Sequence, residues 1–281
     1  MVFRDAFLKS AEAGRMGVPT VPLSDLYGVA ANYIAERGGE VHLRASVESF
    51  TSLPEGVSVN AGGEELLFDY LIPAVPYQGL EKILPDSPES EPIRHELTEF
   101  RSSPITGIHL WFDREITPLD HAVLLERNIQ WMFQKSKILE GRVASSHAPL
   151  GAGSYLELVV SSSKSMVNMG RNEIIDLALA ELAEFFPKAK EARVLKATVV
   201  KEIHATFSPT PGLEKHRPSP LTPWPRVFLT GDWTATGWPA TMEGAVRGGY
   251  ITAQTLANVR GDEQTFLVPE LAPRGLMRLF R

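Results

Sequence analysis

The sequence contains no cysteine among its 281 residues. That absence excludes disulfides, thiolate metal ligands and cysteine nucleophiles, and it fits a reducing compartment. Acidic residues outnumber basic ones by 34 to 28, so the net charge of −6 does not suggest a nucleic-acid partner. No apolar run approaches the about 20 residues of a membrane span, and Arg4, Asp5 and Lys9 interrupt any signal-peptide core. We therefore expect a cytoplasmic protein, with membrane association at most peripheral.

The sequence also lacks a Gly-x-Gly-x-x-Gly strand-turn-helix, the pattern that binds dinucleotide pyrophosphates. Its nearest approximation, residues 151–156, ends in leucine and precedes a predicted strand. The seven histidines are scattered without metal-ligand spacing, so we expect no metal site. The 43% hydrophobic and 22% charged residues are nevertheless typical of a globular protein with a sizeable core.

Helical and strand patterns follow one another along the chain. Helices are predicted at 3–13, 23–37 and 172–186, the last with Asn172 as its N-cap. Strands are predicted at 40–50, 57–61, 66–74, 105–112, 129–133, 154–161, 193–206 and 227–230. Together they predict a first domain at 1–76 and 206–262, an inserted domain at 77–205 and a tail at 263–281.

The clearest chemistry lies in residues 227–258. A predicted strand ends at Gly231-Asp232, and ligands of open α/β sheets bind at the carboxyl ends of strands. Gly231 lets the backbone approach a ligand, and the Asp232 carboxylate can accept two hydroxyl protons of a ribose or ribityl chain. The alternative is that Asp232 only caps a turn. Trp238 and Pro239 would shield a flat cofactor from water, or plug the space under the loop.

The helix that follows favours the ligand interpretation. Thr241 is a good N-cap, and we expect unpaired amides at Met242, Glu243 and Gly244. Such amides and the positive end of the helix dipole favour an electron-rich group such as the pyrimidine edge of a flavin.

These residues resemble a known signature. Residues 231–250, GDWTATGWPATMEGAVRGGY, are similar to the C-terminal FAD signature of the amine-oxidase/phytoene-desaturase flavoprotein superfamily. The version that begins at Trp233 resembles the squalene-associated FAD-dependent desaturase branch, the hydroxysqualene dehydroxylases. The resemblance extends over nearly the whole chain through residues 17–27, 36–50, 103–116, 128–133, 205–212 and 217–218.

The resemblance implies an α/β and α+β fold. An incomplete FAD-binding domain of the Rossmann-like, glutathione-reductase type would carry an inserted substrate domain of mixed sheet and helices. The family's N-terminal dinucleotide-binding unit has no counterpart in the sequence. The elements beside it should therefore expose apolar surface or pair with a partner chain that supplies the unit.

Residue roles also follow from the resemblance. Asp232 would hold the ribityl chain, the amides of Met242 and Glu243 would face the flavin ring, and the backbone of Val47 would contact the adenine end. The full implied FAD set is Val47, Gly231, Asp232, Trp238, Pro239, Met242, Glu243 and Gly244. Apolar candidates for a polyprenyl pocket, with ordinary core packing as the alternative, are Leu110, Trp111, Trp131 and Phe133.

The implied reaction is the reductive dehydroxylation of hydroxysqualene to squalene, with reduced FAD as hydride source. A proton donor is needed for the leaving hydroxyl, and His109, Glu126 and Glu157 remain equal candidates. A carotenoid desaturase of the phytoene type and a non-catalytic lipid-binding chain without flavin are the alternatives. The tail 267–281 combines three arginines with apolar residues, so it predicts peripheral membrane contact or a frayed terminus.

Overall fold

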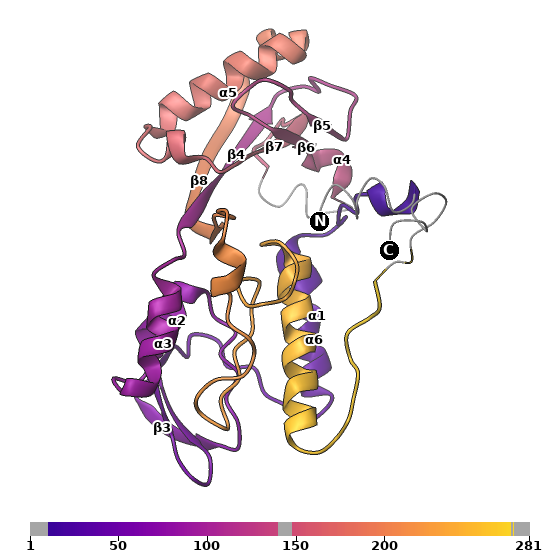
Figure 1. Cartoon of the computed structure of the whole chain (residues 1–281). Coiled ribbons are helices and arrows are strands. Elements are labelled where there is room, and N and C mark those ends of the chain that lie inside the picture. Colours follow the sequence, from indigo (N-terminus) through magenta and orange to yellow (C-terminus); the bar gives the residue numbers. More distant parts are fainter. Residues whose placement is uncertain (1–10, 140–147, 271, 273–281) are drawn as a thin grey trace. The chain divides into compact units, whose positions relative to one another are not determined.

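The computed structural model describes residues 11–139, 148–270 and 272 (Figure 1). Two compact units are present. The first, here the Asp232 unit, consists of His42–Ser102 and Thr206–Pro269. The second, here the five-stranded unit, takes the described residues of Met1–Val41, Ser103–Ala205 and Glu270–Arg281. Most of the helix predicted at 3–13 lies outside the described residues, which show only the 3-10 turn Ala11–Gly14.

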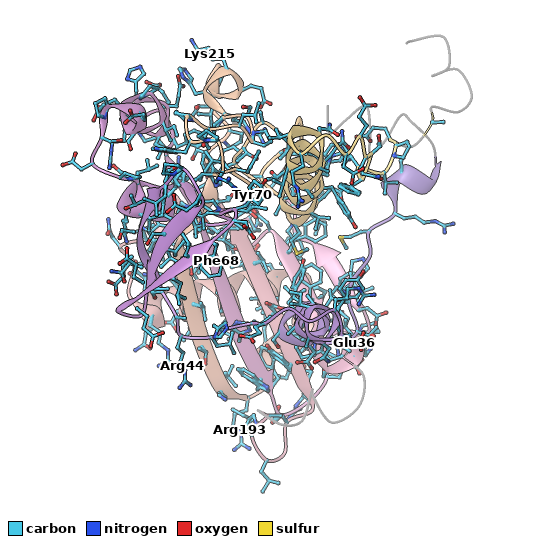
Figure 2. The ribbon with its side chains drawn as sticks, turned by 90° about the horizontal axis from the view of Figure 1, so that it is seen from below. Glu36, Arg44, Phe68, Tyr70, Arg193 and Lys215 are labelled. Atoms are coloured by element: carbon cyan, nitrogen blue, oxygen red, sulfur yellow. The ribbon has the colours of Figure 1, made fainter. Side chains whose placement is uncertain are left out.

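An antiparallel hairpin sheet begins the Asp232 unit. β1 (Val47–Ser52), β2 (Val57–Ala61) and β3 (Glu64–Phe68) lie in the order β1-β2-β3. The strand predicted at 57–61 is confirmed, whereas the one predicted at 40–50 starts only at Val47. The 66–74 prediction was also too long, because the chain leaves the hairpin after Phe68. Phe68 and Tyr70 are labelled in Figure 2, and the Tyr70 ring packs against Phe228 with centroids 6.2 Å apart.

Beyond Tyr70 the chain pairs in parallel with the segment before Asp232. Phe228 N donates to Leu71 O at 2.9 Å, and Leu71 N donates to Arg226 O at 3.0 Å. The strand predicted at 227–230 is therefore extended but forms only isolated bridges. Pro73 is one reason, because it has no N–H for a continuing ladder. The helix predicted after this segment is confirmed as α6 (Met242–Val259), with Thr241 as its N-cap.

Two short helices pack onto the core of this unit. α2 (Tyr77–Ile83) and α3 (Glu91–Leu97) lie within His42–Ser102, although we expected residues from 77 onward in the inserted domain. Aromatic contacts explain their placement. The Phe100 ring lies 5.1 Å from Tyr77 and 5.9 Å from Trp233, centroid to centroid, so these helices share the core beneath the Asp232 loop.

The other unit contains a five-stranded sheet. Its strands are β4 (Ser102–Phe112), β5 (His121–Val123), β6 (Trp131–Gln134), β7 (Ser154–Ser161) and β8 (Val194–Phe207), in the order β5-β6-β7-β4-β8. Its helices are α1 (Leu23–Ala35), α4 (Lys135–Ile138) and α5 (Arg171–Phe185).

The helix α5 covers one face of this sheet (Figure 1). Its N-cap is Gly170, two residues before the predicted cap Asn172, and the Gly170 amide donates to the Glu173 carboxylate at 3.2 Å. Buried residues alternate along the strands beneath it, as a half-covered sheet requires. The core between helix and sheet includes Ile108, Leu110, Met132, Leu156, Leu158, Val160, Ile174, Ala178 and Leu182.

Candidate functional site

A sharp turn at Gly231 starts the loop that precedes α6. Gly231 has a φ of +147°, which disfavours residues with a Cβ, and a Cβ there would lie 2.8 Å from Trp233 Nε1. The Trp233 side chain is buried, and its Nε1 donates to Val75 O at 2.9 Å. The indole therefore fixes the loop to the core, while Asp232 remains half-buried.

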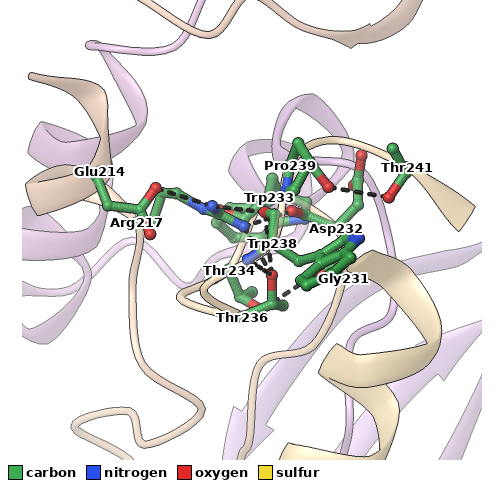
Figure 3. A network of polar contacts seen from close by, with 10 residues as sticks. All are labelled: Glu214, Arg217, Gly231, Asp232, Trp233, Thr234, Thr236, Trp238, Pro239 and Thr241. Atoms are coloured by element: carbon green, nitrogen blue, oxygen red, sulfur yellow. Dashed lines mark hydrogen bonds and ion pairs between the residues drawn. The ribbon is translucent and has the colours of Figure 1, made fainter. Parts of the chain in front are cut away.

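The same loop surrounds a buried arginine that the sequence analysis missed (Figure 3). The Arg217 guanidinium donates to Asp232 O at 2.8 Å, Trp238 O at 2.9 Å and Thr236 Oγ1 at 2.9 Å. Its remaining acceptors are Glu214 Oε2 at 2.9 Å and, more weakly, Trp233 O at 3.4 Å. The only available signal was the Arg-Pro pair at 217–218, a segment of the family resemblance to which no role was given.

Opposing effects act on the pKa of Asp232. Partial burial raises it above the usual value, because burial disfavours the charged form. The positive charge of Arg217 and hydrogen bonds from the amides of Asp232 and Trp233 counteract that rise. A half-buried carboxyl group is suited to accept hydrogen bonds from ligand hydroxyls.

Two hydrogen bonds of the Thr241 hydroxyl shape the start of α6. Thr241 Oγ1 accepts from Gly244 N at 3.1 Å and donates to Pro239 O at 3.1 Å. The expectation of an unpaired Gly244 amide was therefore wrong, because the N-cap side chain takes it. Gly244 is buried, and a Cβ there would lie 2.6 Å from Pro239 O, so the helix approaches the loop too closely for a side chain.

The first-turn side chains of α6 point in different directions. Met242 is 59% exposed. The Glu243 carboxylate instead pairs with Arg247 at 3.5 Å, and the Arg247 guanidinium lies 4.8 Å from the centroid of the Trp238 ring. Trp238 is therefore stacked under a cation at the end of the loop, beside the helix start.

These groups fit the ribityl and ring portion of a flavin. The Thr230 hydroxyl is buried and has no hydrogen-bond partner among the described residues, and it directly precedes Gly231. The same unit contains the Asp232 carboxyl group, which can accept hydrogen bonds from hydroxyls, and the start of α6, the positive end of its dipole. Val47 lies in the same unit, at the bulged start of β1 opposite Ala61. The FAD roles assigned to these residues stay predictions.

The four apolar pocket candidates lie on opposite faces of the five-stranded sheet. Leu110 is fully buried beneath α5, so the core alternative applies to it. Trp111, paired with Tyr155 across the strands, belongs to the other face, because successive side chains alternate. Trp131 and Phe133 share that face, since Phe133 lies opposite Glu157. We call it the aromatic face, formed by His109, Trp111, Trp131, Phe133, Tyr155 and Glu157.

Aromatic rings on this face are stacked in pairs. The Trp111 and Tyr155 rings lie 4.3 Å apart with 7° between their planes, and the Trp131 and Phe133 rings 5.8 Å apart with 8°. Trp111 is buried, whereas Tyr155, Trp131 and Phe133 are half-buried. Flat, partly exposed rings provide a platform for an apolar ligand.

Polar groups lie among these rings. His109 Nδ1 lies 2.9 Å from the Tyr155 hydroxyl, and Lys135 pairs with Glu157 at 3.1 Å. Burial lowers the pKa of His109; the charge of Glu157 opposes this effect and that of Lys135 reinforces it. For Tyr155, burial and the charge of Glu157 raise the pKa to about 12. Of the three proposed proton donors, His109 and Glu157 therefore share this face, while Glu126 is exposed in a turn at a φ of +59°.

Comparison with known proteins identifies the family. Residues 13–257 match the model for flavin containing amine oxidoreductases. The chain belongs to this family. The family implies a flavin cofactor, in agreement with the predicted superfamily.

The curated relatives of this amine oxidoreductase family member include carotenoid desaturases. A 15-cis-phytoene desaturase of Synechococcus elongatus is 32% identical over 275 residues, which cover 92% of this chain and 54% of the relative. A probable zeta-carotene desaturase of the same organism is 23% identical over 272 residues, covering 89% and 56%. The chain therefore spans about half the length of the curated relatives it matches.

A solved structure has the same fold. An oxidoreductase from Methanosarcina mazei superposes with a TM-score of 0.58 at 16% identity, covering 77% of this chain and 50% of that one. It confirms the predicted fold class, an incomplete flavoprotein fold of mixed α/β type. Among the helices that the structure describes, none is long and apolar enough to cross a bilayer.

Proposed function

We propose that this chain forms part of an FAD-dependent carotenoid desaturase of the phytoene type. The observation that carries the proposal is the 32% identity to a 15-cis-phytoene desaturase over 92% of the chain. Hydroxysqualene dehydroxylation, our first expectation, rests on the version of the FAD signature that begins at Trp233, and the relatives favour desaturation. Desaturation removes a hydride and a proton from adjacent carbons, so it requires an oxidant and a proton acceptor.

In this proposal the Asp232 unit holds the cofactor. Bound FAD would supply the two-electron acceptor. The Asp232 carboxylate would accept hydrogen bonds from the ribityl hydroxyls, and the N-terminus of α6 would favour negative charge at the flavin ring. Trp238 and Pro239 exclude water from the ring, and the backbone of Val47 contacts the adenine end.

The aromatic face is the proposed surface for the polyene. The half-buried, stacked rings of Trp131 and Phe133 bind a long apolar chain without needing polar partners, and the buried Trp111 ring supports the Tyr155 ring on this face. The lowered pKa of His109 keeps its imidazole neutral near pH 7, the form that can accept a proton. Glu157 stabilises the imidazolium that would result, because it raises the pKa of His109.

Two further contacts belong to the proposal. Met242, Val246 and Tyr250 form an exposed apolar row at i, i+4 and i+8 on α6, and every residue of β3 is exposed. Such surface fits a polypeptide partner carrying a dinucleotide-binding unit. The membrane contact predicted for 267–281 falls mostly on residues outside the described part, since 271 and 273–281 are not described. Liposome co-sedimentation with and without residues 267–281 tests it.

The experiment measures flavin binding and substrate choice separately. The purified chain is titrated with FAD while flavin fluorescence is followed, and FAD-loaded protein is then incubated with phytoene and a quinone. We expect saturable binding and a more conjugated product that absorbs at longer wavelength. Trp131→Leu should reduce turnover of phytoene without changing FAD affinity. Conversion of hydroxysqualene by reduced flavin, with phytoene untouched, would contradict the proposal. Absence of FAD binding, both by the chain alone and in the presence of a polypeptide that carries a dinucleotide-binding unit, would favour the lipid-binding alternative.

A further inference from the structure

We propose that Arg217 is a positioning residue that locks the loop Gly231–Pro239 into one shape before any cofactor binds. Its guanidinium is almost fully buried, with a side chain only 3% exposed. A buried charge is tolerated only when its donors are satisfied. Most of its acceptors are backbone carbonyls and a hydroxyl of this one loop, so the loop must be closed for the charge to be stable.

The hydrogen bonds from Arg217 to backbone carbonyls also set the direction in which the following backbone N–H groups point. Because C=O and the following N–H point in opposite directions, a carbonyl held by Arg217 turns the next amide away from it. Arg217 holds Asp232 O, and the next amide, that of Trp233, bonds the Asp232 carboxylate. Arg217 Nε holds Trp233 O, and the amide of Thr234 donates to Gly231 O at 3.3 Å. The arginine therefore orients the carboxylate indirectly, through the backbone.

Pro218, the residue after Arg217, makes a second contact with the loop. Ala235 N donates to Pro218 O at 2.8 Å, immediately after Arg217 in the chain. At the far end, Thr236 Oγ1 accepts from both Arg217 and the Trp238 amide. One planar group thus joins residues 232, 233, 236 and 238, which a lysine with its single nitrogen cannot do.

An ion pair alone does not account for the stability of the buried Arg217 charge. Glu214 is its only carboxylate partner among the described residues, and the Glu214 side chain is 68% exposed. A solvated partner of this kind contributes little. The neutral acceptors of the loop provide the remaining contacts, and the Phe207 ring, 5.4 Å from the guanidinium carbon, covers it.

The first test uses the protein without flavin, so it is independent of the proposed function. Hydrogen exchange is followed by NMR in the wild type, Arg217→Met, Arg217→Lys and Thr236→Val. We expect Arg217→Met to speed exchange of the Ala235 and Trp238 amides at least tenfold. Arg217→Lys should recover little of the loss, and Thr236→Val should speed exchange mainly at Trp238.

Arg94→Met is the matched control. The Arg94 guanidinium also donates to backbone carbonyls, those of Glu81 and Leu84, but outside the loop. It should leave the loop amides unchanged. If Arg217→Met and Arg94→Met affect the loop equally, or if Arg217→Lys restores it fully, the inference is wrong. Should Arg217→Met fail to fold, Arg217→Lys and Thr236→Val decide the matter.

A spectroscopic titration adds a readout that general loss of structure would not mimic. In protein labelled at aspartate carboxyl carbons, Arg217→Met should raise the pKa of Asp232, because the guanidinium lowers it. Arg94→Met should not. The effect on cofactor binding rests on the proposed function: FAD affinity should fall at least tenfold in Arg217→Met and remain unchanged in Arg94→Met. If the wild type binds no FAD yet the loop responds as expected, only the proposed function fails.

Discussion

We expect Asp232 to lower the stability of the fold at neutral pH while it is required for FAD binding. Its carboxyl group is half-buried and its pKa is raised, so the folded state binds the proton more tightly than the unfolded chain does. The stability it contributes is therefore greatest below the unfolded pKa and is lost as pH rises through the folded pKa. We predict that Asp232→Asn raises the free energy of unfolding at pH 7 by about 1 kcal/mol or less, given its solvent exposure, while it abolishes FAD binding.

Urea unfolding between pH 3.5 and 7.5, together with FAD titration, checks this prediction. The stability difference between Asp232→Asn and the wild type should grow toward neutral pH. Asp86→Asn, an exposed aspartate of the same unit, should show neither effect. A variant that is destabilised at pH 7 while still binding FAD would show that Asp232 is a turn cap only.

His109 offers a second prediction for a single residue. Burial lowers the pKa of its imidazole, so its neutral form contributes stability above the unfolded pKa, which is lost as pH falls through the folded one. Glu157→Gln should lower the pKa of His109 further, and Lys135→Met should raise it, because these charges act with opposite signs. Imidazole proton shifts in an NMR titration measure both. Lys137→Met, which removes a cation paired with Glu115, serves as the control.

At the scale of elements, two neighbouring glycines of α6 make a matched pair. Gly248 is buried, and a Cβ there would lie 2.9 Å from Gly231 O and 3.1 Å from Gly231 N. Gly249 is exposed, with nothing within 4 Å of its Cβ position. We predict that Gly248→Ala destabilises the fold by about 1–3 kcal/mol, because backbone atoms must shift. Gly249→Ala should stabilise it by about 0.5–1 kcal/mol through helix propensity.

Chemical unfolding of both variants tests this contrast, and FAD titration extends it. Since Gly248 faces the Gly231 turn, its replacement should also weaken FAD binding, whereas Gly249→Ala should not. Equal stabilities of the two variants would mean that α6 does not press on the loop.

Local sequence patterns predicted where helices and strands lie better than they predicted which face of the sheet each side chain occupies. The strand 154–161 and the start of α6 at Thr241-Met242 were predicted correctly, because alternation and capping are encoded within a few residues. The pocket prediction combined Leu110 with Trp111, although adjacent strand residues lie on opposite faces. Arg217 was missed for a different reason: its acceptors in the loop lie 15 to 21 residues away, and only the folded loop brings them to it.

At the scale of the molecule, the two compact units have separate hydrophobic cores. Leu80 belongs to the core that includes Phe50 and Trp233, and Leu158 to the core between α5 and the five-stranded sheet. Both side chains are fully buried. Because neither core contains residues of the other, we predict that each leucine affects mainly its own unit.

Native-state hydrogen exchange measures this separation. Leu158→Ala should lower the opening free energy of β4, β6 and β7 amides by about 2–5 kcal/mol, with α6 amides changed little. Leu80→Ala should have the reverse pattern and should also loosen the Asp232 loop through Trp233. The double variant should show the sum of the two effects within about 0.5 kcal/mol. If Leu158→Ala instead lowers protection equally in both units, the cores unfold together, and a mutation on the aromatic face could weaken FAD binding without touching the flavin site.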